Sequence, residues 1–366
     1  MIWLTWRQFR LNAASAAVVL AAFSVLLAVT GPHLATLYAG SRIGSCHGGG
    51  CGGPADDFLQ QLYGNSLTGA SSVDGTGAYW LLYLLAILVI LGTPAVIGIF
   101  WGAPLISSEF EARTHYLVWN QSITRTRWLA VKFALTGLAA IGFTEALSLL
   151  YGWWAAPISR AVARGAVTTP LAMNQFSPLV FASHGITPLG YAAFAFALGV
   201  TAGVLIRRAI PAMALTLSVF VLLQVAVPLW ARPHLFPPER SLTSLSAFAD
   251  LPDVSVENGS FTVITDGWTR EPEGWVLSSE TVDLAGQPIS SIPAACTRAA
   301  QLTGGKGESA GLLNCLSSHG VRIAVTYQPA SRYWAFQWTE TAIYGALALA
   351  LAGYCFWRIV RRRFSP

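Results

Sequence analysis

The sequence predicts an all-α polytopic membrane protein with six transmembrane helices and a small α+β extracytoplasmic domain between helices five and six. The first observation behind this fold class is composition. Apolar residues make up 54% of the 366 residues and charged residues only 11%, against about 25% charged in soluble domains. A soluble chain of this size could not cover its surface with so few charges. The composition therefore excludes an ordinary cytosolic enzyme, a disordered chain and a nucleic-acid-binding protein.

The second observation is a set of six apolar stretches, each long enough to cross the hydrocarbon core, which takes about 20 helical residues. They are residues 12–30, 79–101, 129–154, 185–206, 211–230 and 335–357. Trp80 and Trp101 bracket the second stretch, and Trp334 and Trp357 the last, as membrane interfaces favour. The first stretch is longer than a signal-peptide core and no small-residue cleavage site follows it, so we expect a retained helix.

Basic residues predict that both termini are cytoplasmic. In this orientation, 12 of the 22 lysines and arginines fall in four short cytoplasmic pieces, residues 1–11, 102–132, 207–211 and 358–366. Short cytoplasmic loops carry such an excess in multi-pass proteins. The leading sequence "MIWLTWRQFR" puts Ile2, Trp6 and Phe9 on one helical face, which predicts a short interfacial helix ahead of the first span.

This predicted membrane topology divides the chain into three parts. Residues 1–230 hold helices one to five, an outer loop at 31–78 that is rich in Gly and Ser, and a cytoplasmic loop at 102–128. We expect the outer loop to be irregular. Residues 231–333 form the extracytoplasmic domain, and residues 334–366 form the sixth helix with a basic cytoplasmic tail.

The extracytoplasmic segment has a more polar composition with alternating runs. "GSFTVIT", "GWVLSSETV" and "VRIAVTYQP" have the alternation of strands, whereas "CTRAAQL" and "GLLNCLSS" have helical composition. This combination predicts an α+β fold.

Two cysteine pairs lie in segments predicted to be outside the cell, where disulfides persist. Cys46 and Cys51 flank a glycine run, and Cys296 and Cys315 lie in the long outer segment. These two pairs are the natural disulfides, although spacing alone leaves other pairings open. Together with His47, the first pair could instead bind a metal, but no fourth ligand is evident, so we predict no metal site.

The chain carries no recognisable catalytic motif. The segment "TGGKGES" is similar to a phosphate-binding loop. That motif requires a glycine five residues before its Gly-Lys pair and a Ser or Thr after it, and these positions hold Ala300 and Gly307. We therefore predict that the chain is not an enzyme and holds no cofactor of its own.

Two carboxylates fall inside predicted spans, and ionisable groups there mark functional sites by default. Glu145 lies in the third span; Glu340 lies near the outer end of the sixth, one turn after Gln337. These three residues are the candidates for lining a translocation cavity. In the alternative interpretation, Glu340 reaches the outer interface and Glu145 is neutral or hydrogen-bonded across helices.

The cytoplasmic segment after the second span is the most informative. Pro104 is expected to break the second span, and the following residues have helical composition with Glu109 and Arg113 four residues apart. A short solvated helix between two spans would have the same pattern.

Four segments in order along the chain resemble the membrane subunits of ABC-2 (type V) exporters, specifically the permease subunits common in actinobacteria. They are "MIWLTWRQFR", "APLISSEFEARTHYLVWNQSITRTRWLAVK", "GITPLGYAAFAFALGVTAGVLIRRAIPAM" and "YQPASRYWAFQWTETAIY". Residues 31–78 match this pattern less well.

The resemblance implies an exporter subunit in a bacterial plasma membrane. Because the predicted spans lack a dense network of charged residues, we expect an amphipathic or lipid-like substrate rather than an ion. In that family the helix after the second span couples to a separate ATP-binding cassette ATPase subunit, which binds the ATP and Mg; residues 105–120 take this place. The side chains implied in coupling are Glu109, Glu111, Arg113, His115 and Tyr116. A second membrane subunit, identical or related, is also implied. The alternative function is a membrane signalling or scaffold protein with an extracytoplasmic sensor domain.

Overall fold

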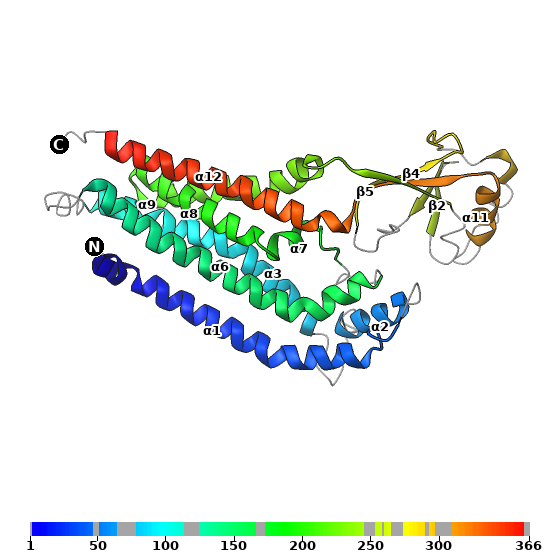
Figure 1. The fold of residues 1–366 in the computed structure, drawn as a ribbon, viewed down its shortest axis with the longest axis horizontal. Helices are drawn as coiled ribbons and strands as arrows, with labels where there is room; N and C mark the ends of the chain where they lie inside the picture. The colour runs from blue at the N-terminus through cyan, green and yellow to red at the C-terminus, as the bar shows by residue number, and fades with distance from the viewer. Residues whose placement is uncertain are drawn as a thin grey trace.

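The protein is an elongated helical bundle with a small β-sheet at one end and both termini at the other (Figure 1). We call these ends the sheet end and the terminal end. The computed structural model describes residues 2–46, 51–63, 78–112, 124–165, 173–244, 253–257, 260–264, 274–289, 293–296 and 309–361.

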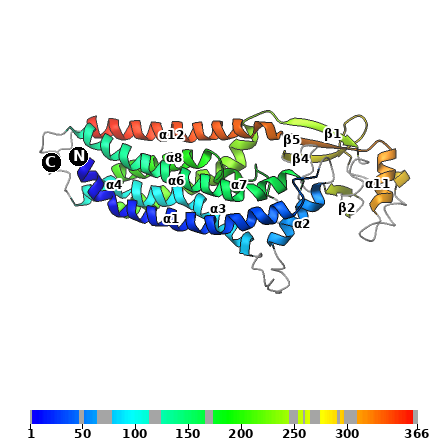
Figure 2. The same ribbon diagram turned by 60° about the horizontal axis from the view of Figure 1, so that its bottom comes forward.

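Six helical runs are long and apolar enough to cross a membrane, which confirms the six predicted spans. They are built on α1 (Ile2–Gly40), α3 (Ala78–Val96), α6 (Arg125–Ala163), α8 (Thr187–Ile206), α9 (Ala209–Ala226) and α12 (Tyr333–Arg361). Consecutive spans run in opposite directions along the bundle (Figure 2). The first turns of α1 lie at an angle to the rest of that helix (Figure 2); their place at a membrane interface stays a prediction.

The expectation of an irregular first outer loop is wrong for much of it. Helix α1 continues to Gly40 with Pro32 inside it, and α2 covers Gly52–Tyr63. The buried residues of α2 are Ala55, Phe58, Leu59 and Leu62, spaced as one face of a helix. This amphipathic face packs into the core at the sheet end, and the high glycine content of the surrounding loop obscured it.

Pro104 does not break the second span, contrary to expectation. A π-helical segment, Ile97–Gly102, joins α3 to α4 (Pro104–Glu111), and Ala103 keeps helical φ and ψ values of −60° and −47°. The Ala103 N–H donates to Gly98 O at 2.9 Å, five residues back. A proline has no N–H to donate, and the widened π turn lets the helix pass this position.

Helix α8 is the centre of the bundle, and most of its residues are buried. The backbone of α8 approaches the glycines of the second span closely. A Cβ built on Gly98 would lie 2.8 Å from Ala195 O, and one built on Gly102 would lie 2.7 Å from Phe196 O. On the α8 side, Gly199 and Gly203 approach the same backbone. The two GxxxG spacings therefore face each other across one close contact.

The sheet lies between the fifth and sixth spans in the chain. It is antiparallel with order β1 (Glu239–Ser244), β5 (Arg322–Gln328) and β4 (Trp275–Val282), and β2 (Asp253–Glu257) pairs separately with β3 (Ser260–Ile264). The three predicted strands are confirmed as β3, β4 and β5, whereas β1 and β2 were not foreseen.

The helical element of this segment is also confirmed, as α11 (Ser309–Ser318); most of "CTRAAQL" lies outside the described residues. The structure forms both natural cysteine pairs, Cys46–Cys51 and Cys296–Cys315. The remaining cysteine, Cys355, is buried in α12. His47, the third ligand of the alternative metal site, lies outside the described residues.

Candidate translocation and coupling sites

At the terminal end, α4 is tied to the start of α6 by an ion pair. Glu109 pairs with the ammonium group of Lys132, whose side chain is 3% exposed. The ammonium also lies 5.3 Å from the centre of the Trp128 ring, within the range of a cation–π interaction. Glu109 thus has a partner on another span, and its predicted neighbour Arg113 lies outside the described residues.

A second contact ties α4 to the hairpin between α8 and α9. Glu111 Oε1 accepts a hydrogen bond at 3.2 Å from the N–H of Ala209, the first residue of α9. This N–H belongs to the first turn of a helix, where backbone N–H groups have no acceptor within the helix itself. The Arg207 guanidinium lies 6.0 Å from the Phe110 ring in the same region. Short as it is, α4 therefore contacts three spans.

These contacts concern two of the five predicted coupling residues. Arg113, His115 and Tyr116 lie outside the described residues. The coupling role of all five stays a prediction.

At the sheet end, Glu340 lies in a buried polar cluster. Arg232 donates to it twice, from Nε to Oε2 at 2.9 Å and from Nη2 to Oε1 at 3.1 Å. The Tyr191 hydroxyl donates to the same carboxylate, and the guanidinium lies 4.0 Å from the Phe181 ring. Neither Arg232 nor Glu340 has any exposed surface. A bidentate pair with aromatic stacking offsets part of the cost of burying two charges, and the remaining terminal nitrogen of Arg232, Nη1, is buried without a hydrogen-bond partner among the described residues.

Gln337 clamps the connection between α7 (Pro178–Ser183) and α8. Its amide oxygen accepts from the N–H groups of Ile186 and Thr187, each at 3.1 Å, and its amide nitrogen donates to Phe181 O at 3.2 Å. Gly185, at φ 67°, leaves no room for a side chain, since a Cβ there would lie 2.7 Å from the amide oxygen. The polar groups of Gln337 thus bind protein atoms.

Glu145 differs from the other two cavity candidates. Its side chain is half-buried, and its Oε2 atom is buried without a hydrogen-bond partner among the described residues. An orphaned carboxylate oxygen in a span is the kind of group expected to meet a ligand or water. A cavity-lining role for Glu145, Gln337 and Glu340 stays a prediction.

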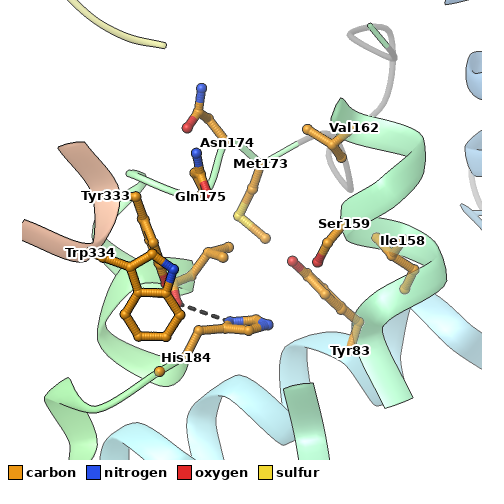
Figure 3. A pocket seen from close by; sticks show the side chains of 12 residues that line it. Tyr83, Ile158, Ser159, Val162, Met173, Asn174, Gln175, His184, Tyr333 and Trp334 are labelled. Atoms are coloured by element: carbon orange, nitrogen blue, oxygen red, sulfur yellow. Dashed lines mark hydrogen bonds between the residues drawn. The ribbon is translucent and has the colours of Figure 1, made fainter. Parts of the chain in front are cut away.

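The sheet end also contains a pocket of about 260 Å³ between α3, α6, α7 and the start of α12 (Figure 3). Its lining is mostly apolar and aromatic, and none of the described residues that line it is charged. Figure 3 shows the hydroxyls of Tyr83 and Ser159 and the ring of His184 pointing into the same space, with Met173 and Trp334 beside them.

His184 is held in one orientation. Its Nδ1 lies 3.1 Å from Val180 O (dashed line in Figure 3), and a carbonyl oxygen only accepts, so Nδ1 carries the hydrogen. Nε2 is buried without a hydrogen-bond partner among the described residues. Burial lowers the pKa of His184, although the hydrogen bond to Val180 acts in the opposite sense. Burial therefore favours the neutral ring, in which Nε2 carries a lone pair.

Sequence reasoning missed Lys132, Arg232, Tyr191 and His184. Lys132 carried a usable signal, because it is one of two lysines in the chain and follows Trp128 by one turn. Arg232 was assigned to the extracytoplasmic domain, but it lies on the helical run that continues α9 to His234. Nothing in the sequence around Tyr191 or His184 marks them out.

Comparison with known proteins identifies one matching family. The chain matches no curated protein and no solved structure. A family model described as "ABC-2 membrane transporter related" matches residues 17–232, which is more than half of the chain and reaches from the first span into the last turn of the fifth. Proteins of this kind are membrane subunits of transporters that work with an ATPase. With six candidate spans and a match of this extent, the chain belongs to the ABC-2 membrane transporter related family and is a multi-pass membrane protein.

Proposed function

We propose that this chain is the permease subunit of an ATP-binding cassette exporter of the type V class in a bacterial plasma membrane. The observation that carries the proposal is the family match over residues 17–232. The sequence has no Walker motif, so a separate subunit would bind ATP and Mg and supply the energy. The family match does not favour the signalling or scaffold alternative.

In this proposal the terminal end is cytoplasmic and the sheet end lies outside. The basic clusters at Arg207–Arg208 and Arg361–Arg363 support this orientation. The two disulfides support it as well, because Cys46–Cys51 and Cys296–Cys315 both belong to segments at the sheet end.

Coupling would pass through α4 and the residues that follow it. An ATPase that closes on residues 105–120 would push α4, and α4 is linked to α6 by Glu109–Lys132 and to α9 by Glu111–Ala209. Through these two contacts, a displacement of α4 would also displace α6 and α9. The bundle would then switch between inward-facing and outward-facing states, with a second membrane subunit completing the pathway for an amphipathic or lipid-like substrate.

The test is ATP hydrolysis by the complex of this chain with its ATPase subunit, reconstituted in nanodiscs. We expect Glu111→Lys combined with Arg113→Glu to lower the hydrolysis rate at least threefold, because reversed charges would disturb the contact between subunits. The matched control is Glu280→Lys, a charge reversal at an exposed position of β4, which should leave the rate unchanged. ATP hydrolysis by the pure chain, or an unchanged rate in the double variant, would contradict the proposal.

A further inference from the structure

The pocket at the sheet end has the chemistry of a ligand site that the preceding proposal does not define. Its walls are mainly apolar, with the side chains of Ile158 and Val162 on the side opposite the rings of Tyr333 and Trp334 (Figure 3). Concave, mostly apolar sites with a few convergent polar groups are typical of small-molecule binding.

His184 is the feature that points to a ligand. A buried acceptor without a partner costs free energy in the folded protein, and Nε2 of His184 is such an acceptor among the described residues. Because Nδ1 donates to Val180 O, the ring cannot turn its lone pair elsewhere without losing that bond. A hydrogen-bond donor in the pocket would restore the missing partner.

The lining restricts the charge of that donor. None of the described lining residues is charged, so an ionic group would lose its hydration without gaining a counter-charge. A hydroxyl loses much less on entering such a site, and the hydroxyls of Tyr83 and Ser159 offer it further partners (Figure 3).

Size and position favour an amphiphile over a free polar solute. The volume of about 260 Å³ exceeds the ~150 Å³ of a cavity that holds benzene, so it has room for a small polar group and several carbons. Trp334 lines the pocket yet is 56% exposed at the start of the sixth span, where aromatic rings mark the membrane interface. The exposed ring of Trp334 is therefore the side of the pocket toward which a hydrocarbon chain would extend.

We propose that this pocket binds the uncharged, hydroxyl-bearing end of a lipid-like amphiphile, with the hydroxyl donating to Nε2 of His184 and the hydrocarbon part passing Met173 and Trp334. As an identification of the cargo, this inference rests on the proposed exporter function. As a binding site, it requires no ATPase.

The experiment uses the full chain in nanodiscs of dioleoylphosphatidylcholine, a lipid without a hydroxyl donor. The probe is a monoacylglycerol with a diazirine in its acyl chain, and the labelled peptides are mapped by mass spectrometry. We expect labelling on the peptides that contain Met173 and Trp334. Monooleoylglycerol should compete, whereas methyl oleate (no hydroxyl), oleate (charged) and free glycerol (no chain) should not at the same concentration.

Variants test the role of the histidine. His184→Phe keeps an aromatic ring but removes the acceptor, and we expect labelling to fall about three- to tenfold. His184→Gln can place its amide oxygen near the position of Nε2 and should retain more labelling than His184→Phe. The matched control is His33→Phe, an exposed histidine on α1 outside the pocket, which should label as the wild type does.

A second variant keeps the test informative if His184→Phe fails to fold. Val162→Phe fills the pocket from α6 without touching the histidine's hydrogen bond and should also reduce labelling. Equal competition by methyl oleate, or undiminished labelling in both His184→Phe and Val162→Phe, would overturn the inference. Since the ATPase subunit is absent, a failure here leaves the exporter proposal standing, and a failure of coupling leaves the binding site standing.

Discussion

Arg232 and Glu340 place two charges where neither has any exposed surface. Their bidentate contact, the Tyr191 hydroxyl and the Phe181 ring replace part of the hydration that both groups give up. A buried pair of this kind adds little to stability over an apolar pair, but the loss of one partner leaves a buried charge unpaired.

We therefore expect Glu340→Gln to lower the free energy of unfolding by about 3–5 kcal/mol, which thermal unfolding in detergent would measure. The double variant Arg232→Met with Glu340→Leu should recover much of this loss. The matched control is Glu239→Gln, which breaks the partly exposed pair with Arg332 and should cost under about 1 kcal/mol. Equal effects of the two glutamate variants would argue against an ion pair at Glu340.

His184 predicts a dependence of stability on pH. Burial holds its pKa in the folded protein below the usual 6.5, so between the two values the unfolded chain binds a proton that the folded chain does not. Unfolding is then favoured as pH falls. The groups facing the ring are Tyr83, Tyr151 and Tyr333, which stay neutral over this range.

We expect the thermal midpoint of the wild type to fall as pH is lowered from 7.5 through 6.5 to 5. In His184→Gln this dependence should be smaller, because the titrating group is gone. His33→Gln serves as the control and should keep the wild-type profile. Parallel profiles for wild type and His184→Gln would show that another group titrates.

Among the elements, α8 sets how closely the spans pack. Gly199 lies against the backbone of Gly98, Gly102 and Ala103, so any side chain there must push two helices apart. Overpacking of a close contact costs about 1–3 kcal/mol. The π-helical segment Ile97–Gly102 provides the partner surface, and the same segment carries the chain past Pro104.

Gly199→Ala should therefore destabilise the protein by about 1–3 kcal/mol and lower the yield of folded chain in size-exclusion chromatography. Gly92→Ala is the matched control, because Gly92 also lies in a span but has nothing within 4 Å of a built Cβ. Its stability should be unchanged or slightly raised, since alanine favours helices over glycine. A neutral Gly199→Ala would mean that the two spans are not in close contact.

For the whole molecule, the alternating spans put both termini at one end and the sheet at the other (Figure 1). In the proposed orientation, the terminal end faces the cytoplasm and the sheet end faces the outside of the cell. The basic tail and α4 then share the cytoplasmic side, where an ATPase subunit would bind.

Labelling of single cysteines in intact cells tests this orientation. In a background with the native cysteines replaced by serine, Glu280→Cys on β4 should react with a membrane-impermeant maleimide added from outside. Arg361→Cys at the end of α12 should react only after permeabilisation. Both positions are exposed in the structure, so a difference between them reports sidedness. Labelling of Arg361→Cys in intact cells would invert the orientation and remove the basis for the coupling proposal.

The sequence by itself determined the six spans, because a long apolar run must leave water whatever its neighbours are. It also indicated three strands and α11 through local patterns of alternation and helical composition. The polar strand β1 was missed because its side chains are exposed or half-buried and show no apolar alternation, and because its pairing partner β5 lies far along the chain. Helix α2 was missed because a glycine-rich setting masked four well-spaced apolar residues.

Only the tertiary structure decided the partners of the polar groups inside the bundle. Glu109 pairs with Lys132 across 23 residues, and Glu340 pairs with Arg232 across 108; no local pattern could have joined them. The pocket around His184 likewise exists only because four separate helices meet at the sheet end. Whether a segment can span the membrane is decided by its own composition, whereas a buried charge or an orphaned lone pair is decided by how segments pack, and packing is specified by the chain as a whole.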